Sequence, residues 1–229
     1  MAVAGAWGAL RRKTPRAVRR AAWRTLTALR RTEPGLLMRY GSANVPEPLD
    51  PPPGYELRSW QPGDDEEWIE LLNASGSFGQ WDHERLATEA EGLVRTAQFF
   101  IVHRQHLVAA TGILERQLDR LPGLELAWVV RHPSFKERRL GRCTVIRALR
   151  SALEWSPPRP IFLYTDDERL TAIEIYLELG FIPDLESHKS YPRRWQAVNA
   201  ALALRKTAAL SEETPAAGGH EVPASPAGQ

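Results

Sequence analysis

Residues 128–149 read WVVRHPSFKERRLGRCTVIRAL, and no other segment says as much about the architecture of the chain. An apolar run over 128–130 predicts a strand, a short basic loop follows, and the apolar spacing over 141–155 predicts a helix. This arrangement points free backbone N–H groups and the positive end of a helix dipole at whatever lies in the loop. Both features favour an anion, especially phosphate. The segment therefore predicts a phosphate-binding turn between a strand and a helix.

A second informative segment, 163–181, reads LYTDDERLTAIEIYLELGF. Its spacing predicts a helix in which Ala172, Tyr176 and Leu179 share one face. Gly180 follows directly, and glycine favours the left-handed conformation that often ends a helix. The apolar residues before the helix predict another strand. The two segments together predict a strand–helix–strand–helix order.

Elsewhere between residues 55 and 210, the spacing of apolar residues alternates between that of strands and that of helices. Asp64 or Asp65, and also Asp82, are suited to cap helices. We expect strands at 55–60, 98–103, 107–114, 124–130, 160–165 and from Phe181, and helices at 64–74, 82–93, 141–155, 169–179 and 196–210. The order β-α-α-β-β-β-α-β-α-β, followed by a closing helix, predicts an α/β domain around a mixed sheet.

Both segments resemble the sequence motifs of the GNAT superfamily of N-acetyltransferases. The family's acetyl-CoA loop reads (Gln/Arg)-x-x-Gly-x-(Gly/Ala), and residues 136–141, KERRLG, occupy that place after His132 and Pro133. The family's next motif reads Asn-x-x-Ala-(x)3-Tyr-(x)3-Gly-Phe, and it is matched by Arg169, Ala172, Tyr176, Gly180 and Phe181. The resemblance covers about 55–184 and implies the GNAT fold, a mixed β-sheet flanked by helices.

Three residues depart from these motifs. Lys136 replaces Gln or Arg, Arg139 replaces the first glycine, and Arg169 replaces Asn. The basic loop has two interpretations: a solvated charged surface, or extra cation–phosphate contacts beside the backbone N–H groups. Its place before a helix favours the second interpretation for the loop as a whole. For Arg139 both stay open, because its Cβ could also crowd a phosphate.

The resemblance implies transfer of an acetyl group from acetyl-CoA, used as a co-substrate, to an amine by direct attack on the thioester. In the family, the backbone of the strand before the loop binds pantetheine and polarises the thioester. The expected acetyl-CoA contacts are Val129, Val130, Arg131, Lys136, Arg138, Arg139, Leu140, Gly141, Arg142 and Arg169. No metal is expected, because the six histidines lack the H-x-x-x-H and H-E-x-x-H spacings. Cys143 is expected to be a small packed residue.

Two residues are predicted to be catalytic. An alkyl amine with a pKa of about 10.4 is almost entirely protonated at pH 7, so it must lose a proton before attack. Some family members place a glutamate eleven residues before the loop motif, and Glu125 stands there, where partial burial would raise its pKa. The family's helix tyrosine often protonates the leaving thiolate, and Tyr176 matches it. The alternatives are a solvent-facing Glu125 with a water relay instead, and a Tyr176 that only packs in the core.

The acceptor is expected between the first two helices, where the family builds its acceptor site. Trp81, Asp82 and His83 lie there, and their aromatic, acidic and imidazole groups suit a polar or cationic acceptor. A helix cap explains Asp82 equally well. His188 and His83 are weaker candidates that also fit surface positions. The sequence does not specify whether the acceptor is a small-molecule amine or a protein amine.

Charge divides the chain into a basic N-terminus and an acidic remainder. Residues 1–40 carry ten Arg/Lys and one acid, a net +9, whereas the other residues sum to −7. Five prolines within 45–54 would stiffen a linker. We expect a basic amphipathic arm (1–31), a proline-rich linker (32–54), a GNAT-like acetyltransferase domain (55–210) and a disordered tail (211–229). A chain starting near Val45 should then retain acetyl transfer.

The composition excludes several classes of protein. One cysteine excludes a disulfide framework, and no apolar run reaches the roughly 20 residues of a membrane helix. The arm at 1–31 could dock on nucleic acid or an anionic membrane, so a non-catalytic module that binds CoA or a polyanion is the alternative to an enzyme. A cytoplasmic location is expected. An organelle presequence is the alternative, although the arm contains no serine. The oligomeric state stays open.

Overall fold

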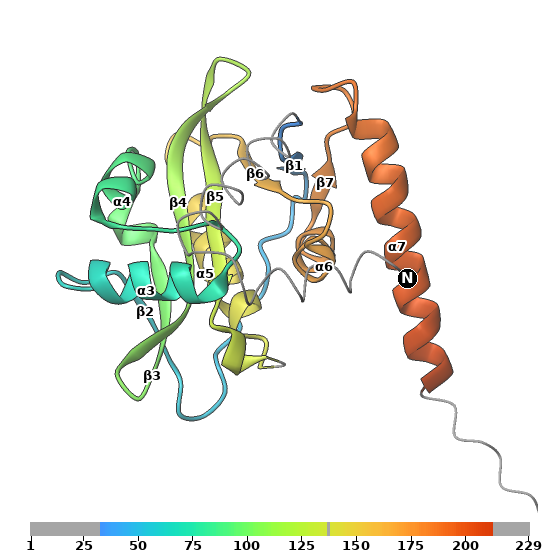
Figure 1. Cartoon of the computed structure of the whole chain (residues 1–229). Helices are drawn as coiled ribbons and strands as arrows, with labels where there is room; N and C mark the ends of the chain where they lie inside the picture. Colours follow the sequence, from blue (N-terminus) through green and yellow to red (C-terminus); the bar gives the residue numbers. More distant parts are fainter. Residues whose placement is uncertain (1–32, 137, 213–229) are drawn as a thin grey trace, which may run out of the picture.

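The computed structural model describes residues 33–136 and 138–212, with only the backbone for 207–212. These residues form one seven-stranded mixed sheet in the order β2-β3-β4-β5-β6-β1-β7, with helices against both of its faces (Figure 1). The strands are β1 (Leu36–Tyr40), β2 (Glu56–Ser59), β3 (Phe99–His103), β4 (His106–Leu118), β5 (Leu121–Arg131), β6 (Ile161–Thr165) and β7 (Phe181–Pro183). The helices are α3 (Asp65–Ser75), α4 (His83–Glu89), α5 (Leu140–Leu153), α6 (Leu170–Glu178) and α7 (Tyr191–Glu212), with short 3-10 turns η1 (Arg95–Ala97) and η2 (Pro133–Phe135).

From β2 to β7, the order of elements is the one predicted from the sequence, so the predicted fold class is confirmed. Several boundaries move: α4 ends at Glu89 instead of residue 93, and α7 begins at Tyr191 instead of residue 196. The hairpin of β4 and β5 is also longer, since β4 ends at Leu118 instead of residue 114 and β5 begins at Leu121 instead of residue 124. The predicted arm at 1–31 lies outside the described residues. The predicted tail begins two residues too early, because α7 continues to Glu212, and the rest of that tail lies outside the described residues.

The sheet is buried on both faces, as alternate side chains of β3 show. Phe100 points toward α3, where the Trp68 ring meets it edge-on at a centroid distance of 5.6 Å. Ile101 points the other way and packs with Leu140 and Cys143 of α5. The two faces therefore carry separate apolar clusters, one under α3 and α4 and one under α5.

The strand β1 was not predicted, and it corrects the assignment of 32–54 to a linker. It lies between β6 and β7 and pairs antiparallel with both, with Leu36 opposite Thr165 and Met38 opposite Pro183. Leu36 and Met38 are fully buried. A chain starting near Val45 would lose a central strand, which argues against the expectation that residues 1–40 are dispensable. No sequence pattern indicates this strand, because LLMRY is short and its apolar residues do not alternate with polar ones.

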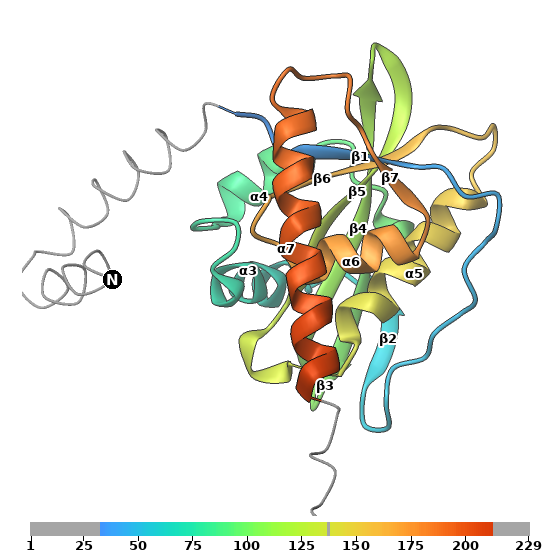
Figure 2. The ribbon, with the colours of Figure 1, turned by 90° about the vertical axis from the view of Figure 1, so that its right-hand side faces the viewer.

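The proline-rich part of the expected linker is tied to the domain. The carbonyl of Pro46 accepts a hydrogen bond of 2.7 Å from Arg150, and that of Asp50 accepts one of 3.7 Å from the Cys143 thiol. Figure 2 shows this segment running from β1 to β2 beside α5. It is a strap along α5.

The helix α7 closes the fold on the side of β7 and α6 (Figure 2). It packs through Tyr191, Trp195 and Val198, each at most 2% exposed. Among the described residues, no helix is long and apolar enough to cross a bilayer.

The strands β5 and β6 run parallel but pair over only two residues, Leu124 with Ile161 and Glu125 with Phe162. Beyond Glu125, β5 carries a bulge against β4, and Trp128 adopts a positive φ of 50°. A bulge bends a strand and strengthens its twist. The far half of β5 is therefore unpaired on the side of β6, and the candidate site lies there.

Candidate active site

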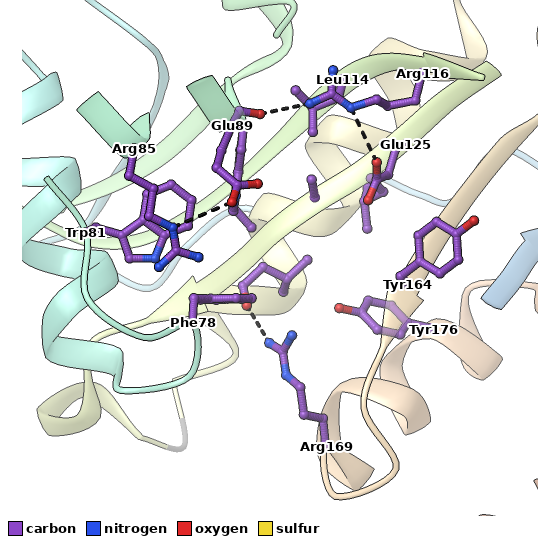
Figure 3. Close-up of a pocket in the computed structure, with 14 residues that line it drawn as sticks. Phe78, Trp81, Arg85, Glu89, Leu114, Arg116, Glu125, Tyr164, Arg169 and Tyr176 are labelled. Carbon is purple, nitrogen blue, oxygen red and sulfur yellow. Dashed lines mark hydrogen bonds and ion pairs between the residues drawn. The ribbon is translucent and has the colours of Figure 1, made fainter. Parts of the chain in front are cut away.

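A cavity of about 260 Å³ lies where β5 and β6 separate (Figure 3). One wall comes from β5, β6 and α6, and the other from the α3–α4 loop and α4. Four of the predicted catalytic and acetyl-CoA-contacting residues line it: Glu125, Val129, Arg169 and Tyr176. The structure therefore brings both predicted catalytic residues to one cavity, next to two of the predicted acetyl-CoA contacts.

Glu125 is a carboxyl group in a largely apolar strand. Its neighbours Leu124 and Leu126 are buried, and its own side chain is 20% exposed. Burial raises its pKa, while the Arg116 guanidinium acts to lower it and the nearby Glu89 to raise it. A carboxylate with a raised pKa is better matched to accept a proton near neutral pH. The position and the raised pKa of Glu125 are compatible with the predicted role as a base, which stays a prediction.

Tyr176 projects from α6, and its hydroxyl points into the cavity (Figure 3). The residue is 2% exposed, and its ring lies edge-on to Phe181 at 5.9 Å. Burial raises its pKa to about 12, against the opposing influence of the Arg169 charge. At neutral pH the phenol is therefore protonated and can donate a hydrogen bond into the cavity. Its packing and its access to the cavity are compatible, so the two interpretations of Tyr176 are not exclusive.

Arg169 links both walls of the cavity. It precedes α6, and its Nη2 donates a hydrogen bond of 2.7 Å to the carbonyl of Val129 in β5. Its guanidinium lies 5.1 Å from the centre of the Phe78 ring, in the loop between α3 and α4. The arginine that replaces the motif's asparagine thus fixes the free edge of β5.

The start of α5 has the shape that the loop motif predicts. Arg139 adopts the left-handed conformation with φ of 54°, which explains why the motif has glycine at this place. Its carbonyl accepts the N–H groups of Arg142 and Cys143, at 2.9 and 3.1 Å, and its side chain does not cap the helix. A Cβ added to Gly141 would meet nothing within 4 Å. The first turn of α5 is therefore open to a ligand.

The basic side chains of the loop point in several directions. Arg142 is ion-paired with Glu178 of α6. Arg138 lies 5.7 Å from the centre of the Tyr55 ring, and it lines a second cavity of about 390 Å³ together with Arg139. Lys136 is exposed. These side chains surround the start of α5 without entering the first cavity.

Three of the predicted acetyl-CoA contacts are held within the protein. The side chains of Val130 and Leu140 are buried in the core, so only their backbone could reach a ligand. Arg131 is half-buried and donates a 3.0 Å hydrogen bond to the carbonyl of His132. Their contact with acetyl-CoA stays a prediction.

The predicted acceptor residues separate in the structure. Trp81 lines the cavity, whereas Asp82 caps α4 by accepting the N–H of Arg85 at 2.8 Å. His83 bonds Glu66 at the surface, 2.7 Å away, and His188 bonds Ser190 beside α7. Neither histidine lines the cavity.

The single cysteine and the histidines form no metal site in the part of the chain that is described. Cys143 is 1% exposed, and burial raises the pKa of its thiol. Groups of three or more His, Cys, Asp or Glu side chains able to hold a metal ion are absent from the described residues. Cys143 is thus a packed residue there, as predicted.

Several cavity residues were missed by sequence reasoning: Phe78, Arg85, Glu89, Arg116 and Tyr164. They come from a loop, a helix and two strands, and no motif connects them. Arg85 stacks on Trp81 at 4.1 Å and reaches Glu89 at 3.6 Å, one turn further along α4. The one available signal was the polar run at 115–117 inside an otherwise apolar strand.

Comparisons with known proteins agree with this geometry. No protein-family model matches the chain, and no curated protein matches it significantly. Among solved structures, it is similar to a GCN5-related N-acetyltransferase from Sphaerobacter thermophilus, with 15% identity and a TM-score of 0.52 over 72% of this chain and 53% of that one. It is also similar to a GNAT-family acetyltransferase from Colwellia psychrerythraea, with 14% identity and a TM-score of 0.50 over 66% and 52%. The matches thus span about half of the length of those two chains. The fold is the GNAT fold.

Proposed function

We propose that this chain, with its GNAT fold, is an acetyl-CoA-dependent N-acetyltransferase that transfers an acetyl group to a small-molecule or protein amine by direct attack on the thioester. One observation carries the proposal. The separation of β5 and β6 opens one cavity onto which a partly buried carboxyl group, Glu125, and a buried phenol, Tyr176, both face.

The residues around the start of α5 suit the phosphates of acetyl-CoA. The open first turn at Gly141 offers N–H groups and the positive end of a helix dipole, and Arg138 and Arg139 add charge. The backbone of Val129, on the free edge of β5, would lie along the pantetheine arm. Bound there, acetyl-CoA supplies an electrophilic thioester and a thiolate leaving group.

Glu125 would remove the proton from the acceptor amine, directly or through a water. An ammonium group must be deprotonated before it can attack, and a carboxylate with a raised pKa is a better base than an exposed one. On the opposite wall, the carboxylate of Glu89 would attract an ammonium group awaiting deprotonation, whereas the rings of Phe78 and Trp81 already contact guanidinium groups.

Tyr176 would donate a hydrogen bond to the departing sulfur. Thiols have pKa values of about 8.5, well below the value of about 12 for this phenol. Complete proton transfer to the thiolate is therefore unfavourable, and the hydrogen bond itself stabilises the developing charge. This refines the general-acid role expected from the motif.

The decisive experiment measures acetyl-CoA-dependent thiol release by the full chain against a panel of amines and peptides. Calorimetry with CoA provides the second measurement, on the wild type and on Gly141→Val and Gly141→Ala. The valine should abolish CoA binding by filling the open first turn, while the alanine, which favours a helix, should leave the fold stable.

Each result has a clear meaning. Unchanged CoA affinity in a folded Gly141→Val variant would remove the start of α5 from the site. CoA binding without turnover on any acceptor would indicate a non-catalytic CoA-binding module instead of an enzyme.

A further inference from the structure

Arg116 lies where three parts of the site meet. It belongs to β4, and its Nη2 donates a hydrogen bond of 2.9 Å to the carbonyl of Glu89, at the end of α4. Its Nη1 donates to the carbonyl of Glu91, just beyond that helix. Its Nε is 4.0 Å from Oε2 of Glu125 in β5 (Figure 3). One guanidinium group thus contacts both the end of α4 and the candidate base.

The local sequence makes these contacts feasible. In the antiparallel ladder, Arg116 is opposite Gly123 and Leu114 is opposite Glu125, so Arg116 and Glu125 are diagonal neighbours on one face. Gly92, with a φ of 80°, forms the turn after α4, and a Cβ there would come within 3.1 Å of Arg116 Nη1. Glycine therefore lets the end of α4 approach β4 closely enough for the arginine to reach it.

The charged groups around Glu125 come from every element packed against it. Arg116 of β4 is the adjacent cation, Glu89 of α4 is an anion that acts on it, and Tyr164 of β6 is a phenol whose pKa is raised by burial and by the Glu125 charge. Arg85, Arg169 and Tyr176 line the rest of the cavity. Arg85 is engaged by Glu89, and Arg169 by the Val129 carbonyl, so Arg116 is the cation directed at Glu125.

We propose that Arg116 is a positioning residue: it holds the Glu125 carboxylate against the cavity wall and ties it to the end of α4. Because two backbone carbonyls fix Nη1 and Nη2 of the planar guanidinium group, its Nε–H is held in a defined position beside Glu125. A displacement of α4, whose residues Arg85 and Glu89 line the acceptor side, would reach Glu125 through this side chain. An effect of Arg116 on catalysis rests on the proposed function of Glu125 as the base, whereas the contact between Arg116 and Glu125 does not.

The contact can be tested without knowing the acceptor. The full chain is labelled with ¹³C at glutamate side-chain carboxyl groups, and the Glu125 resonance is identified by its loss in Glu125→Gln. Removing the neighbouring positive charge in Arg116→Gln should move the titration midpoint of Glu125 to higher pH. The matched control is Arg159→Gln, which removes an arginine paired with Glu115, the residue before Arg116. It should leave the midpoint in place.

An unchanged midpoint in Arg116→Gln, or an equal rise in Arg159→Gln, would overturn the assignment. If Arg116→Gln fails to fold, Arg116→Met, which is uncharged but keeps an apolar stem, is judged by the same criterion.

The catalytic meaning has a separate readout. Once the panel has yielded an amine that the enzyme acetylates, the pH dependence of kcat/KM can be measured. In Arg116→Gln its acid limb should move to higher pH, in the same direction as the NMR titration midpoint of Glu125. Full turnover by Glu125→Gln would contradict the proposed base and remove the catalytic meaning of Arg116, while the NMR titration would still decide the contact.

Discussion

The two walls of the cavity are built differently. The wall of β5, β6 and α6 is held by the sheet: Tyr176 is 2% exposed, and Val129 stands on a strand fixed along its other edge by β4, although Tyr164 of β6 is 46% exposed. The wall of α4 combines a buried ring, that of Trp81, with the charged side chains of Arg85 and Glu89, which are 28% and 50% exposed. Arg116 of β4 ties this wall to the sheet through the backbone carbonyls of Glu89 and Glu91.

This difference separates two properties of the site. Substitutions in the sheet wall should act on folding, on CoA binding and on the chemical step. Substitutions in the helix wall should act mainly on the acceptor and on the pKa of Glu125, because α4 is not part of the hydrogen-bonded ladder of the sheet. The following predictions test this division, from the largest expected effect to the smallest.

Removing residues 1–40 should prevent folding, because β1 supports β6 and therefore the sheet wall. Losing a buried side chain such as Leu36 or Met38 costs about 2–5 kcal/mol, and the total approaches the 5–15 kcal/mol that stabilises a typical protein. Thermal unfolding followed by circular dichroism should show no cooperative transition. A chain that starts at residue 33 is the control, and it should melt as the full chain does. A cooperative transition in the shorter chain would show that the sheet wall is independent of β1.

Glu125→Gln should lower kcat by about 10²–10⁴-fold at neutral pH without lowering the melting temperature. Burial holds the pKa of this carboxyl above its value in the unfolded chain, so the folded state binds the proton more tightly. Its ionisation therefore reduces stability as pH rises through that range, and a neutral amide removes this cost. Glu115→Gln, on the neighbouring strand, is the control for kcat. If the Glu125→Gln variant were strongly destabilised, the carboxylate would contribute to the stability of the fold instead of to catalysis.

Tyr176→Phe should lower kcat by about 10²-fold and leave CoA affinity unchanged, because only the hydrogen bond to the departing sulfur is lost. Tyr191→Phe is the matched control: it removes a buried hydroxyl that donates a 2.7 Å hydrogen bond to the Gly35 carbonyl. That change should cost about 1 kcal/mol of stability with no effect on kcat. Unaltered turnover in Tyr176→Phe, with chemistry rate-limiting, would leave Tyr176 as a packing residue.

Glu89→Gln should raise the KM for a cationic acceptor by roughly two- to fivefold, as expected for losing a partly exposed charge contact of about 0.5–1 kcal/mol. It should also move the acid limb of kcat/KM to lower pH, because Glu89 raises the pKa of Glu125. This direction is opposite to that expected for Arg116→Gln. A change in CoA affinity would contradict the separation of the two walls.

The same difference explains what could be predicted from the sequence. Tyr176 and Glu125 were found because one stands in a motif and the other at a fixed distance from a motif. Glu89 and Arg116 were missed because their proximity to Glu125 depends on how α4 meets β4, which no local pattern encodes. The strand β1 was missed for a similar reason: its partners Thr165 and Pro183 are far along the chain. The local spacing of apolar residues predicts single helices and strands. The pairing of strands that are far apart in the sequence depends instead on the packing of the whole core.

The place of β1 between β6 and β7 has a consequence for synthesis. Leu36 precedes its partner Thr165 by 129 residues, and ribosomes add about 5–20 residues per second. The apolar LLM segment therefore waits roughly 6–26 s before its first partner strand exists, and still longer for β7. During that time it resembles an unpaired sheet edge, a hazard for aggregation and a target for chaperones. A central strand of this sheet, with Leu36 and Met38 fully buried, is thus the first of the described strands to be made and among the last to be able to pair.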